Sequence, residues 1–279
     1  MKKIQQALER KRAERSPLGS SSTMSVAAAP TVAAIDLGDL TLRKIAPDKK
    51  RLRENRVFLG MERESVAMAY KVLRTKVYQT LNKNGWKTLG ITSSSQSEGK
   101  SLTALNLALS LSGSVYQTVI LIDFDMRRPS LARKMEYEPE FGLADYYTRD
   151  VPLTDILLQV EGTDMLLLPG KGSLEDASEW ISSHKTERLM NELSQLFPSH
   201  YLIVDLPPVL AVDDVMAFGA NMDCCLVVAA EGMTKKEELE ESLRVLEFNN
   251  VLGVILNKSG EAQMGRYYYY NRYYKNYYR

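Results

Sequence analysis

The stretch that decides the fold is KTLGITSSSQSEGKSLTALNLALSLS, residues 87–112. Its apolar start predicts a short buried strand, and its end predicts a helix. Between them, SSSQSEGKS matches the phosphate-loop pattern G-x-x-x-x-G-K-[ST] except at the first position, where Ser94 replaces glycine. A loop between a strand and a helix N-terminus is a setting in which backbone N–H groups bind phosphate. The stretch therefore predicts a nucleotide site; an ordinary strand-to-helix turn is the alternative.

The loop supplies the groups that a triphosphate and its magnesium ion require. Lys100 is placed to reach the β and γ phosphates, and the Ser101 hydroxyl is placed to bind Mg²⁺. Small side chains before them allow the backbone to turn tightly around phosphate. The predicted nucleotide-binding residues are Ser94, Ser95, Gln96, Ser97, Glu98, Gly99, Lys100, Ser101 and Leu102.

Further apolar runs follow the loop: QTVILID, DMLLLPG, YLIVDLPP, DCCLVVAA and NVLGVILN. Helical patterns such as TERLMNELSQLF and KKEELEESLRVLEF lie between some of them. Continuous apolar strands that alternate with helices indicate an α/β fold, in which a parallel sheet carries helices on both faces. Ligands of such sheets bind beyond the carboxyl ends of the strands. The polar residues after each run are therefore candidates for the site.

Carboxylates follow two of these runs. Asp123 and Asp125, in VILIDFDMRRP, lie two residues apart and so on the same side of an extended chain. Asp205 ends the run in YLIVDLPP, where a carboxylate commonly holds the magnesium shell. Each alone would be a common turn former, but with the loop they predict a Mg²⁺-nucleotide site. Arg127 and Arg128 would neutralise phosphate or pair with these carboxylates.

Length and composition favour one sizeable folded domain with tails. The chain has 279 residues, of which 44% are hydrophobic, and its net charge of +1 creates no overall attraction to nucleic acid. Cys224 and Cys225 are adjacent in an apolar run, which predicts two reduced, buried thiols. Neither a transmembrane run nor a secretory signal is recognisable, so we expect a cytoplasmic protein.

We predict four regions along the chain. Residues 1–15 are basic and helix-favouring, either a solvated helix or a docking helix. Residues 16–55 are rich in Ser, Ala, Pro and Thr and predict a flexible linker. Residues 56–260 carry the P-loop domain. Residues 261–279 form a tail ending in YYYYNRYYKNYYR, which suits phosphate acceptors, an adhesive segment or an aromatic nucleic-acid arm.

The motifs EGKS, IDFDMRRPSL and IVDLPP, followed by a tyrosine cluster, resemble the bacterial tyrosine kinases, in which Walker A, Walker A′ and Walker B motifs occur in this order. The resemblance covers roughly residues 60–279. A wider group of deviant-Walker ATPases shares the three motifs, so the tyrosine tail is what makes the match specific. The H-R-D and D-F-G motifs of eukaryotic kinases do not occur.

The resemblance implies ATP and Mg²⁺ as cofactors, with Lys100, Asp123 and Asp125 as catalytic residues. Ser101, Asp125 and Asp205 would hold Mg²⁺, and Asp123 would orient or deprotonate the acceptor phenol. A phenol has a pKa near 10 and gains from such a carboxylate at neutral pH. In the wider group an asparagine after the last strand meets adenine, and Asn257 stands there.

The resemblance also implies that the enzyme phosphorylates its own tail in trans between subunits. The expected acceptors are Tyr267, Tyr268, Tyr269, Tyr270, Tyr273, Tyr274, Tyr277 and Tyr278. Each phosphate adds about −1.5 to −2 charges at pH 7, enough to offset the four cations of the tail after two or three transfers. Expected partners are neighbouring subunits that bind the tail, a transmembrane activator of the polysaccharide co-polymerase type, and a tyrosine phosphatase, with no nucleic acid. The process regulated would be polysaccharide synthesis and export at the inner face of the plasma membrane.

The sequence departs from the family at two places. Gln96 and Ser97 replace the usual Pro-Gly pair of the loop. At the spacing of the subunit-contact motif E-x-x-R-x-x-R, this chain has Met68, Lys71 and Arg74, which puts ring assembly in doubt. The main rival function is a division-site or partition-type positioning ATPase, but Ser95 occupies the place of the signature lysine of those proteins.

Overall fold

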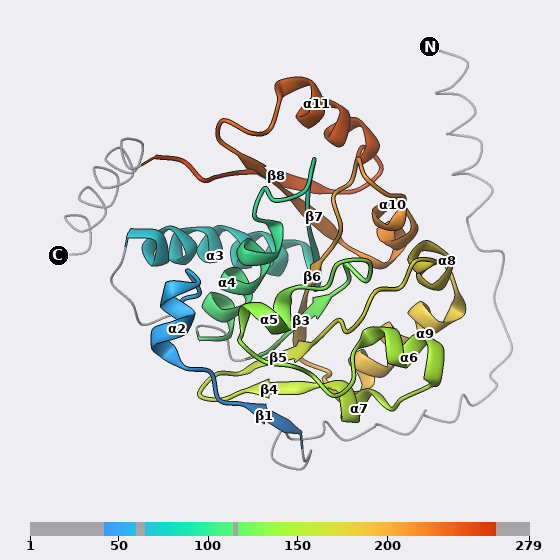
Figure 1. The fold of residues 1–279 in the computed structure, drawn as a ribbon. Helices are drawn as coiled ribbons and strands as arrows, with labels where there is room; N and C mark the ends of the chain where they lie inside the picture. The colour runs from blue at the N-terminus through green and yellow to red at the C-terminus, as the bar shows by residue number, and fades with distance from the viewer. Residues whose placement is uncertain (1–41, 60–64, 114–116, 261–279) are drawn as a thin grey trace, which may run out of the picture. The chain divides into compact units, whose positions relative to one another are not determined.

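The computed structural model describes residues 42–59, 65–113 and 117–260. In this part of the chain, eight strands form one sheet in the order β1-β4-β5-β3-β6-β2-β7-β8 (Figure 1). Neighbouring strands pair in parallel except β4 and β5, which pair antiparallel. The strands are β1 (Arg43–Ile45), β2 (Thr88–Ser93), β3 (Thr118–Asp123), β4 (Leu158–Val160), β5 (Met165–Leu168), β6 (His200–Asp205), β7 (Cys224–Ala230) and β8 (Val251–Asn257).

Helices cover both faces of this sheet. The helices are α2 (Lys49–Glu54), α3 (Ser65–Asn84), α4 (Lys100–Ser112), α5 (Leu131–Lys134), α6 (Leu143–Arg149), α7 (Leu153–Ile156), α8 (Ala177–Ile181), α9 (His184–Leu196), α10 (Asp214–Phe218) and α11 (Lys236–Val245), with a 3₁₀ turn at Gly219–Asn221. Buried residues of α2, α3, α4 and α5 belong to one core cluster, and those of α6, α8, α9 and α10 belong to the other. The predicted α/β fold is therefore confirmed.

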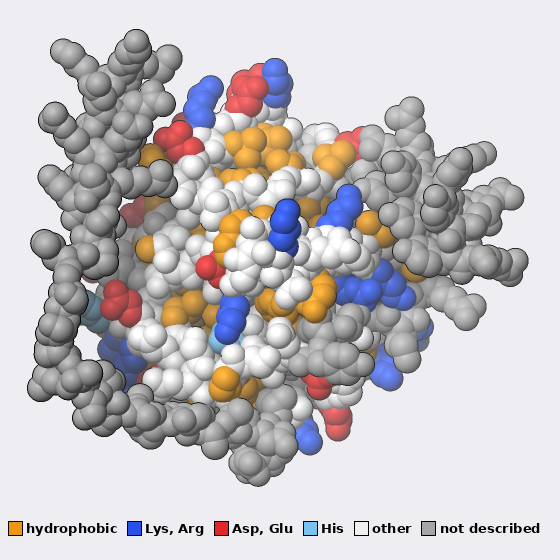
Figure 2. Space-filling view, turned by 180° about the vertical axis from the view of Figure 1, so that it is seen from behind, with side chains coloured by type: hydrophobic (Ala, Val, Ile, Leu, Met, Phe, Trp, Pro, Cys, Tyr) orange, Lys and Arg blue, Asp and Glu red, His pale blue; other side chains and the backbone are white. Residues whose placement is uncertain are grey.

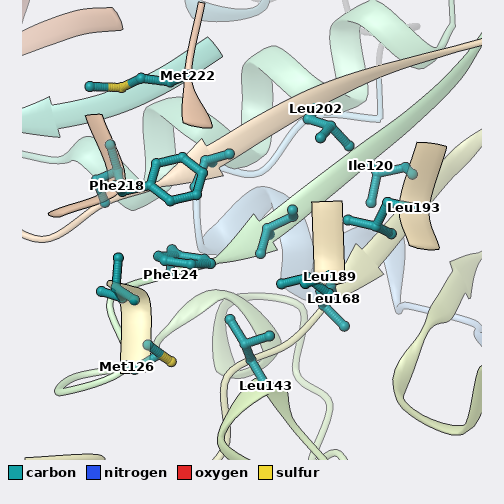
Figure 3. Packing of buried hydrophobic residues seen from close by; sticks show 14 of the residues in the cluster. Ile120, Phe124, Met126, Leu143, Leu168, Leu189, Leu193, Leu202, Phe218 and Met222 are labelled. Atoms are coloured by element: carbon teal, nitrogen blue, oxygen red, sulfur yellow. The ribbon is translucent and has the colours of Figure 1, made fainter. Parts of the chain in front are cut away.

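The strand β3 shows why its sequence is apolar throughout. Ile120 and Ile122 belong to the first core cluster, whereas Val119 and Leu121 belong to the second. Because successive side chains of a strand point to opposite faces, a sheet covered on both faces needs apolar residues at every position. Figure 3 shows the first cluster, in which Ile120 lies with Leu202 of β6 and with Leu189 and Leu193 of α9. The two cores fix the plane of the sheet and hence the edge at which its strands end.

Two sequence-based expectations need correction. The linker prediction is wrong for residues 42–55, because β1 and α2 lie there and Ile45 and Leu52 are only 2% and 1% exposed. The sheet is mixed and not wholly parallel, because β4 runs opposite to β5. The missed strands β1 and β4 have three residues each, too few to show a periodic pattern.

Several predictions fall on other parts of the chain. Residues 1–15, residues 16–41 of the linker and the tail 261–279 with its eight tyrosines lie outside the described residues. Among the helices that are described, none combines the length and the apolar character needed to cross a membrane. Cys224 and Cys225 are buried with free thiols, as predicted, and burial raises the pKa of the Cys225 thiol to about 11.

The surface is mixed in character. On the face shown in Figure 2, separate hydrophobic patches lie among side chains of both charge signs. The exposed large hydrophobic residues of the described chain include Phe248 at 91% and Met216 at 56% exposure. This pattern agrees with the near-neutral net charge of the sequence.

Candidate active site

The phosphate loop connects the carboxyl end of β2 to the first residue of α4. Gly99 caps the helix with a φ of 100°, a left-handed conformation that favours glycine. A Cβ at this position would lie 2.0 Å from Asn257 Nδ2, so a side chain here would have to displace the amide of Asn257. The first N–H groups of α4, beginning at Lys100, have no acceptor within the helix and carry its positive dipole end. They are suited to an anion.

Ser97 adopts the left-handed conformation, with a φ of 62°. For a residue with a side chain this conformation costs roughly 1–2 kcal/mol. The bacterial tyrosine kinases usually have glycine at this position of the loop, so the departure noted in the sequence coincides with local backbone strain. Such strain persists only where surrounding contacts fix the chain.

Ser94, the residue in place of the first glycine, is fully buried. Its Oγ lies 2.8 Å from Oγ of Ser242 on α11, which is also fully buried. The side chain of Ser94 therefore packs and hydrogen-bonds behind the loop. The one mismatch to the phosphate-loop pattern adds a contact to α11 and leaves the loop itself intact.

The predicted carboxylates meet at one point of the sheet edge. Asp123 and Asp205 are direct neighbours in the register of β3 and β6, and both are fully buried. Asp123 Oδ2 accepts hydrogen bonds from the N–H groups of Ser130 and Leu131, both at 2.9 Å. Within the described residues, Asp123 Oδ1 and Asp205 Oδ2 are buried without any hydrogen-bond donor. Two orphaned carboxylate oxygens side by side are costly unless a ligand or a cation uses them.

Lys100 lies on this cluster. Its Nζ is 2.7 Å from Asp125 Oδ2, 3.5 Å from Asp205 Oδ1 and 3.4 Å from Ser101 Oγ. Burial by itself lowers the pKa of Lys100, but attraction to Asp205 and Asp125 outweighs burial, so the pKa is raised. The structure thus brings together every predicted catalytic and magnesium-binding side chain.

The side chain of Asp123 has a raised pKa. Burial, followed by repulsion from Asp205, raises its pKa to about 7, while the N–H groups of Leu131 and Ser130 act in the opposite direction. Burial also raises the pKa of Asp205, although Lys100 opposes this. A carboxylate whose pKa lies near neutrality can accept a proton at working pH.

The donor set suits Mg²⁺ bound together with phosphate. Within the described ranges, no three His, Cys, Asp or Glu side chains are arranged to hold a metal by themselves. Ser101, Asp125 and Asp205 nevertheless offer hard oxygen atoms, one of them orphaned. Mg²⁺ is typically held by one or two carboxylates plus substrate phosphates and water. The residues present therefore fit this ion.

The two arginines after β3 make different contacts from each other. Arg127 donates to both carboxylate oxygens of the buried Asp214 on α10, at 3.3 and 3.2 Å, and to the carbonyl of Glu175. The hydrogen bond to Asp214 raises the pKa of Arg127. Arg127 therefore pairs with Asp214 and not with Asp123 or Asp125, and neutralisation of phosphate by Arg127 stays a prediction.

Arg128 belongs to the site. Its backbone N–H donates to Asp125 Oδ1 at 3.2 Å, and its guanidinium donates to Gln96 Oε1 of the phosphate loop. Gln96 is one of the two loop residues that depart from the family pattern stated above. The bridge ties the strand-end carboxylates to the loop.

Asn257 lies against the loop. Its Nδ2 donates to the carbonyl of Glu98 at 2.9 Å. The contact that the sequence predicted for Asn257, with adenine, stays a prediction. What the structure adds is that the last residue of β8 helps to hold the backbone of the phosphate loop.

Sequence reasoning missed two side chains near the site. Lys134 is half-buried on α5, one helical turn after Ser130. Burial lowers its pKa, while the carboxylates of Asp205 and Asp123 act to raise it. Thr234, after β7, contacts the loop through Glu98. No sequence motif marks either residue.

No family model matches the chain. The putative tyrosine-protein kinase CapB of Staphylococcus aureus is 27% identical over 210 residues, which are 75% of this chain and 91% of CapB. The kinase domain of the Escherichia coli tyrosine kinase ETK superposes with a TM-score of 0.60 at 27% identity, covering 67% of this chain and 73% of that domain. The chain is thus similar in sequence and in fold to bacterial tyrosine kinases. The resemblance stated from the motifs is confirmed, and the relatives are protein-tyrosine kinases, the enzyme class predicted.

Two further likenesses set the context of this relationship. The succinoglycan biosynthesis transport protein ExoP of Rhizobium meliloti is 28% identical over 220 residues, which are 77% of this chain but only 28% of ExoP. The septum site-determining protein MinD of Pyrococcus horikoshii has a TM-score of 0.54 at 19% identity, covering 64% of this chain and 72% of MinD, and shares the fold. The P-loop α/β fold is thus common to the kinases and to the positioning ATPases.

Proposed function

We propose that this protein is an ATP-dependent protein-tyrosine kinase that phosphorylates the tyrosines of its own C-terminal tail. The observation that carries the proposal is the cluster at the sheet edge, where Lys100 lies between Asp125 and Asp205 and the neighbouring Asp123 has a buried, unpaired oxygen. This cluster offers a cation for phosphate, oxygen ligands for Mg²⁺ and a base for a phenol. The kinship with the tyrosine kinases supports the same function.

Nucleotide binding would change the partners of Lys100. The N–H groups at the start of α4 would bind the phosphates, and Lys100 would leave Asp125 for the β and γ oxygens. Ser101, Asp125 and Asp205 would hold Mg²⁺, whose charge would stabilise the negative charge that develops on the phosphates. In the nucleotide-free protein, Lys100 and Asp125 neutralise each other's charge. On binding, Lys100 would pair with phosphate and Asp125 with Mg²⁺, so both charges would stay compensated.

Asp123 would take the proton of the acceptor. The phenol oxygen attacks the γ phosphorus, the bond from that phosphorus to the ADP oxygen breaks, and the phenol proton passes to Asp123. Its Oδ2 is fixed by Ser130 and Leu131, so Oδ1 is the oxygen that accepts. In-line positioning of tail and nucleotide supplies the remainder of the rate enhancement.

The finer parts of the proposal concern partners and location. We infer transfer in trans between subunits, because a tail of many tyrosines can reach a neighbouring site without a fixed register. The match of this chain to 28% of ExoP, which is named a succinoglycan biosynthesis transport protein, supports a membrane activator of that class. We further propose regulation of polysaccharide synthesis or export at the inner membrane face, with a tyrosine phosphatase as the opposing enzyme.

The test is to incubate the full chain with Mg·ATP and to map phosphate by mass spectrometry. Lys100→Met and a chain truncated before Tyr267 are the controls, each checked for folding by thermal melting. Phosphotyrosine within Tyr267–Tyr278 that disappears with Lys100→Met is the expected result. A second reaction with a candidate membrane activator covers the case that the isolated chain is slow.

The second candidate is a positioning ATPase, favoured by the fold shared with MinD. ATP hydrolysis without phosphotyrosine, with and without the activator, would support it and would remove the kinase proposal. Failure to bind nucleotide at all would remove both.

A further inference from the structure

Glu98 of the phosphate loop carries a buried carboxylate with two partners. The residue is 1% exposed. Its Oε2 accepts a hydrogen bond from the N–H group of Ser95 at 2.9 Å, within the same loop. Its Oε1 accepts a hydrogen bond from the hydroxyl of Thr234, which lies 136 residues further along the chain. One side chain therefore joins the loop to the connection between β7 and α11.

Thr234 is itself held firmly. Its Oγ1 accepts a hydrogen bond from the N–H group of Ala230 at 2.8 Å, and its own N–H donates to the carbonyl of Ala230 at 3.0 Å. Ala230 is the last residue of β7 and is 1% exposed. The hydroxyl accepts from the backbone and donates to Glu98, so both of its hydrogen-bonding roles are used.

The backbone of Glu98 is fixed as well. Its carbonyl accepts the hydrogen bond from Asn257 Nδ2 at 2.9 Å, at the end of β8. The ends of β7 and β8 thus hold the side chain and the main chain of one loop residue. The strained Ser97 stands directly before it, with its φ of 62°. Without contacts of this kind, the loop would be free to relax away from the left-handed conformation.

We infer that Thr234 and Glu98 form a brace that holds the phosphate loop in its nucleotide-binding conformation before nucleotide arrives. Both act as positioning residues, since Glu98 acts through the N–H group of Ser95 and Thr234 acts through Glu98. The part of this inference that concerns nucleotide binding rests on the proposed function. Preorganisation removes the cost of ordering the loop at binding, so loss of the brace would appear in the affinity for nucleotide.

The test uses Thr234→Val in the full chain, a near-isosteric change that removes only the hydroxyl. The dissociation constant for a fluorescent ADP with Mg²⁺ should rise roughly tenfold or more, as expected for losing a hydrogen bond to a charged acceptor. Thr234→Ser, which keeps the hydroxyl, should bind within about threefold of the parent protein. In kinetics, the KM for ATP should rise more than kcat falls.

Thr186→Val is the matched control. Thr186 is a threonine, 1% exposed, whose Oγ1 lies 2.8 Å from the hydroxyl of Tyr147 in the opposite core cluster. The Thr186→Val substitution should lower the melting temperature and leave the affinity for nucleotide unchanged. An equal loss of affinity in both variants would mean that Thr234→Val acts by general destabilisation, and the brace would be rejected.

Hydrogen exchange separates the brace from the proposed function. In nucleotide-free protein, the amides of residues 95–99 should exchange faster in Thr234→Val than in the parent protein. Unchanged exchange together with unchanged affinity overturns the inference. If the parent protein binds no nucleotide, the proposed function fails while the exchange experiment still decides the brace. Should Thr234→Val not fold, Glu98→Gln takes its place with the same expectations.

Discussion

The buried carboxylate of Asp123 should make the nucleotide-free protein less stable as pH rises. Its pKa is raised from an ordinary value of 3.8 to about 7, chiefly by burial. Between these values the folded protein binds more protons than the unfolded chain, so the free energy of unfolding falls with increasing pH. At 1.36 kcal/mol per pH unit the whole difference corresponds to at most about 4 kcal/mol.

The substitution Asp123→Asn should remove this penalty. Its amide oxygen can still accept from Ser130 and Leu131, and its NH₂ group would take the place of the unpaired Oδ1. The pKa of about 7 already includes the attraction to Lys100. The amide that replaces the carboxylate is itself a polar group that must be buried, so we expect a gain in stability of about 1–3 kcal/mol at pH 8. Near pH 5 the parent side chain is protonated in the fold and the gain should fall below roughly 1 kcal/mol.

The assay is urea unfolding at pH 5, 6, 7 and 8 in EDTA and without nucleotide. Asp164→Asn, at an exposed position, is the control for the change of net charge. Asp123→Asn should also lose tail phosphorylation, because it removes the proposed base. Two results would refute the assignment of a raised pKa to Asp123. One is a gain in the free energy of unfolding of Asp123→Asn that does not depend on pH, and the other is an Asp123→Asn protein that is less stable than the parent at pH 8.

Three further substitutions test the structure. Ser97→Gly should stabilise the nucleotide-free protein by about 1 kcal/mol in urea unfolding, because it relieves the left-handed strain. Gly99→Ala should abolish binding of fluorescent ADP, since its Cβ would meet the amide at the end of β8, whereas Gly162→Ala, with no atom within 4 Å, should bind normally. Arg127→Met should lower the free energy of unfolding by about 3 kcal/mol, because Asp214 would be left buried and unpaired.

Each of these expectations has a result that contradicts it. An unchanged stability of Ser97→Gly would mean that other contacts already compensate the strain. Normal binding by Gly99→Ala would mean that the loop and Asn257 separate easily. A small effect of Arg127→Met, within about 0.5 kcal/mol, would place Arg127 among surface residues whose charges contribute little.

The sequence by itself determined the sheet and the chemistry of its edge. Six strands follow from continuous apolar runs, since a sheet covered on both faces requires apolar residues at successive positions. Lys100, Asp123, Asp125 and Asp205 could be placed together because parallel strands end at one edge. These features can be predicted because the apolar pattern is visible in the sequence itself. General rules of α/β folds then place the ends of the strands together.

Tertiary structure alone decided which partners the remaining groups take. Arg127 follows the catalytic aspartates in sequence, yet it pairs with Asp214, 87 residues away. Glu98 meets Thr234 and Asn257 only because β7 and β8 end beside the phosphate loop. Such contacts depend on the order of strands in the sheet and on the course of each connection. No periodicity in the sequence encodes them, because the free energy that fixes them comes from burial and hydrogen bonding between distant segments.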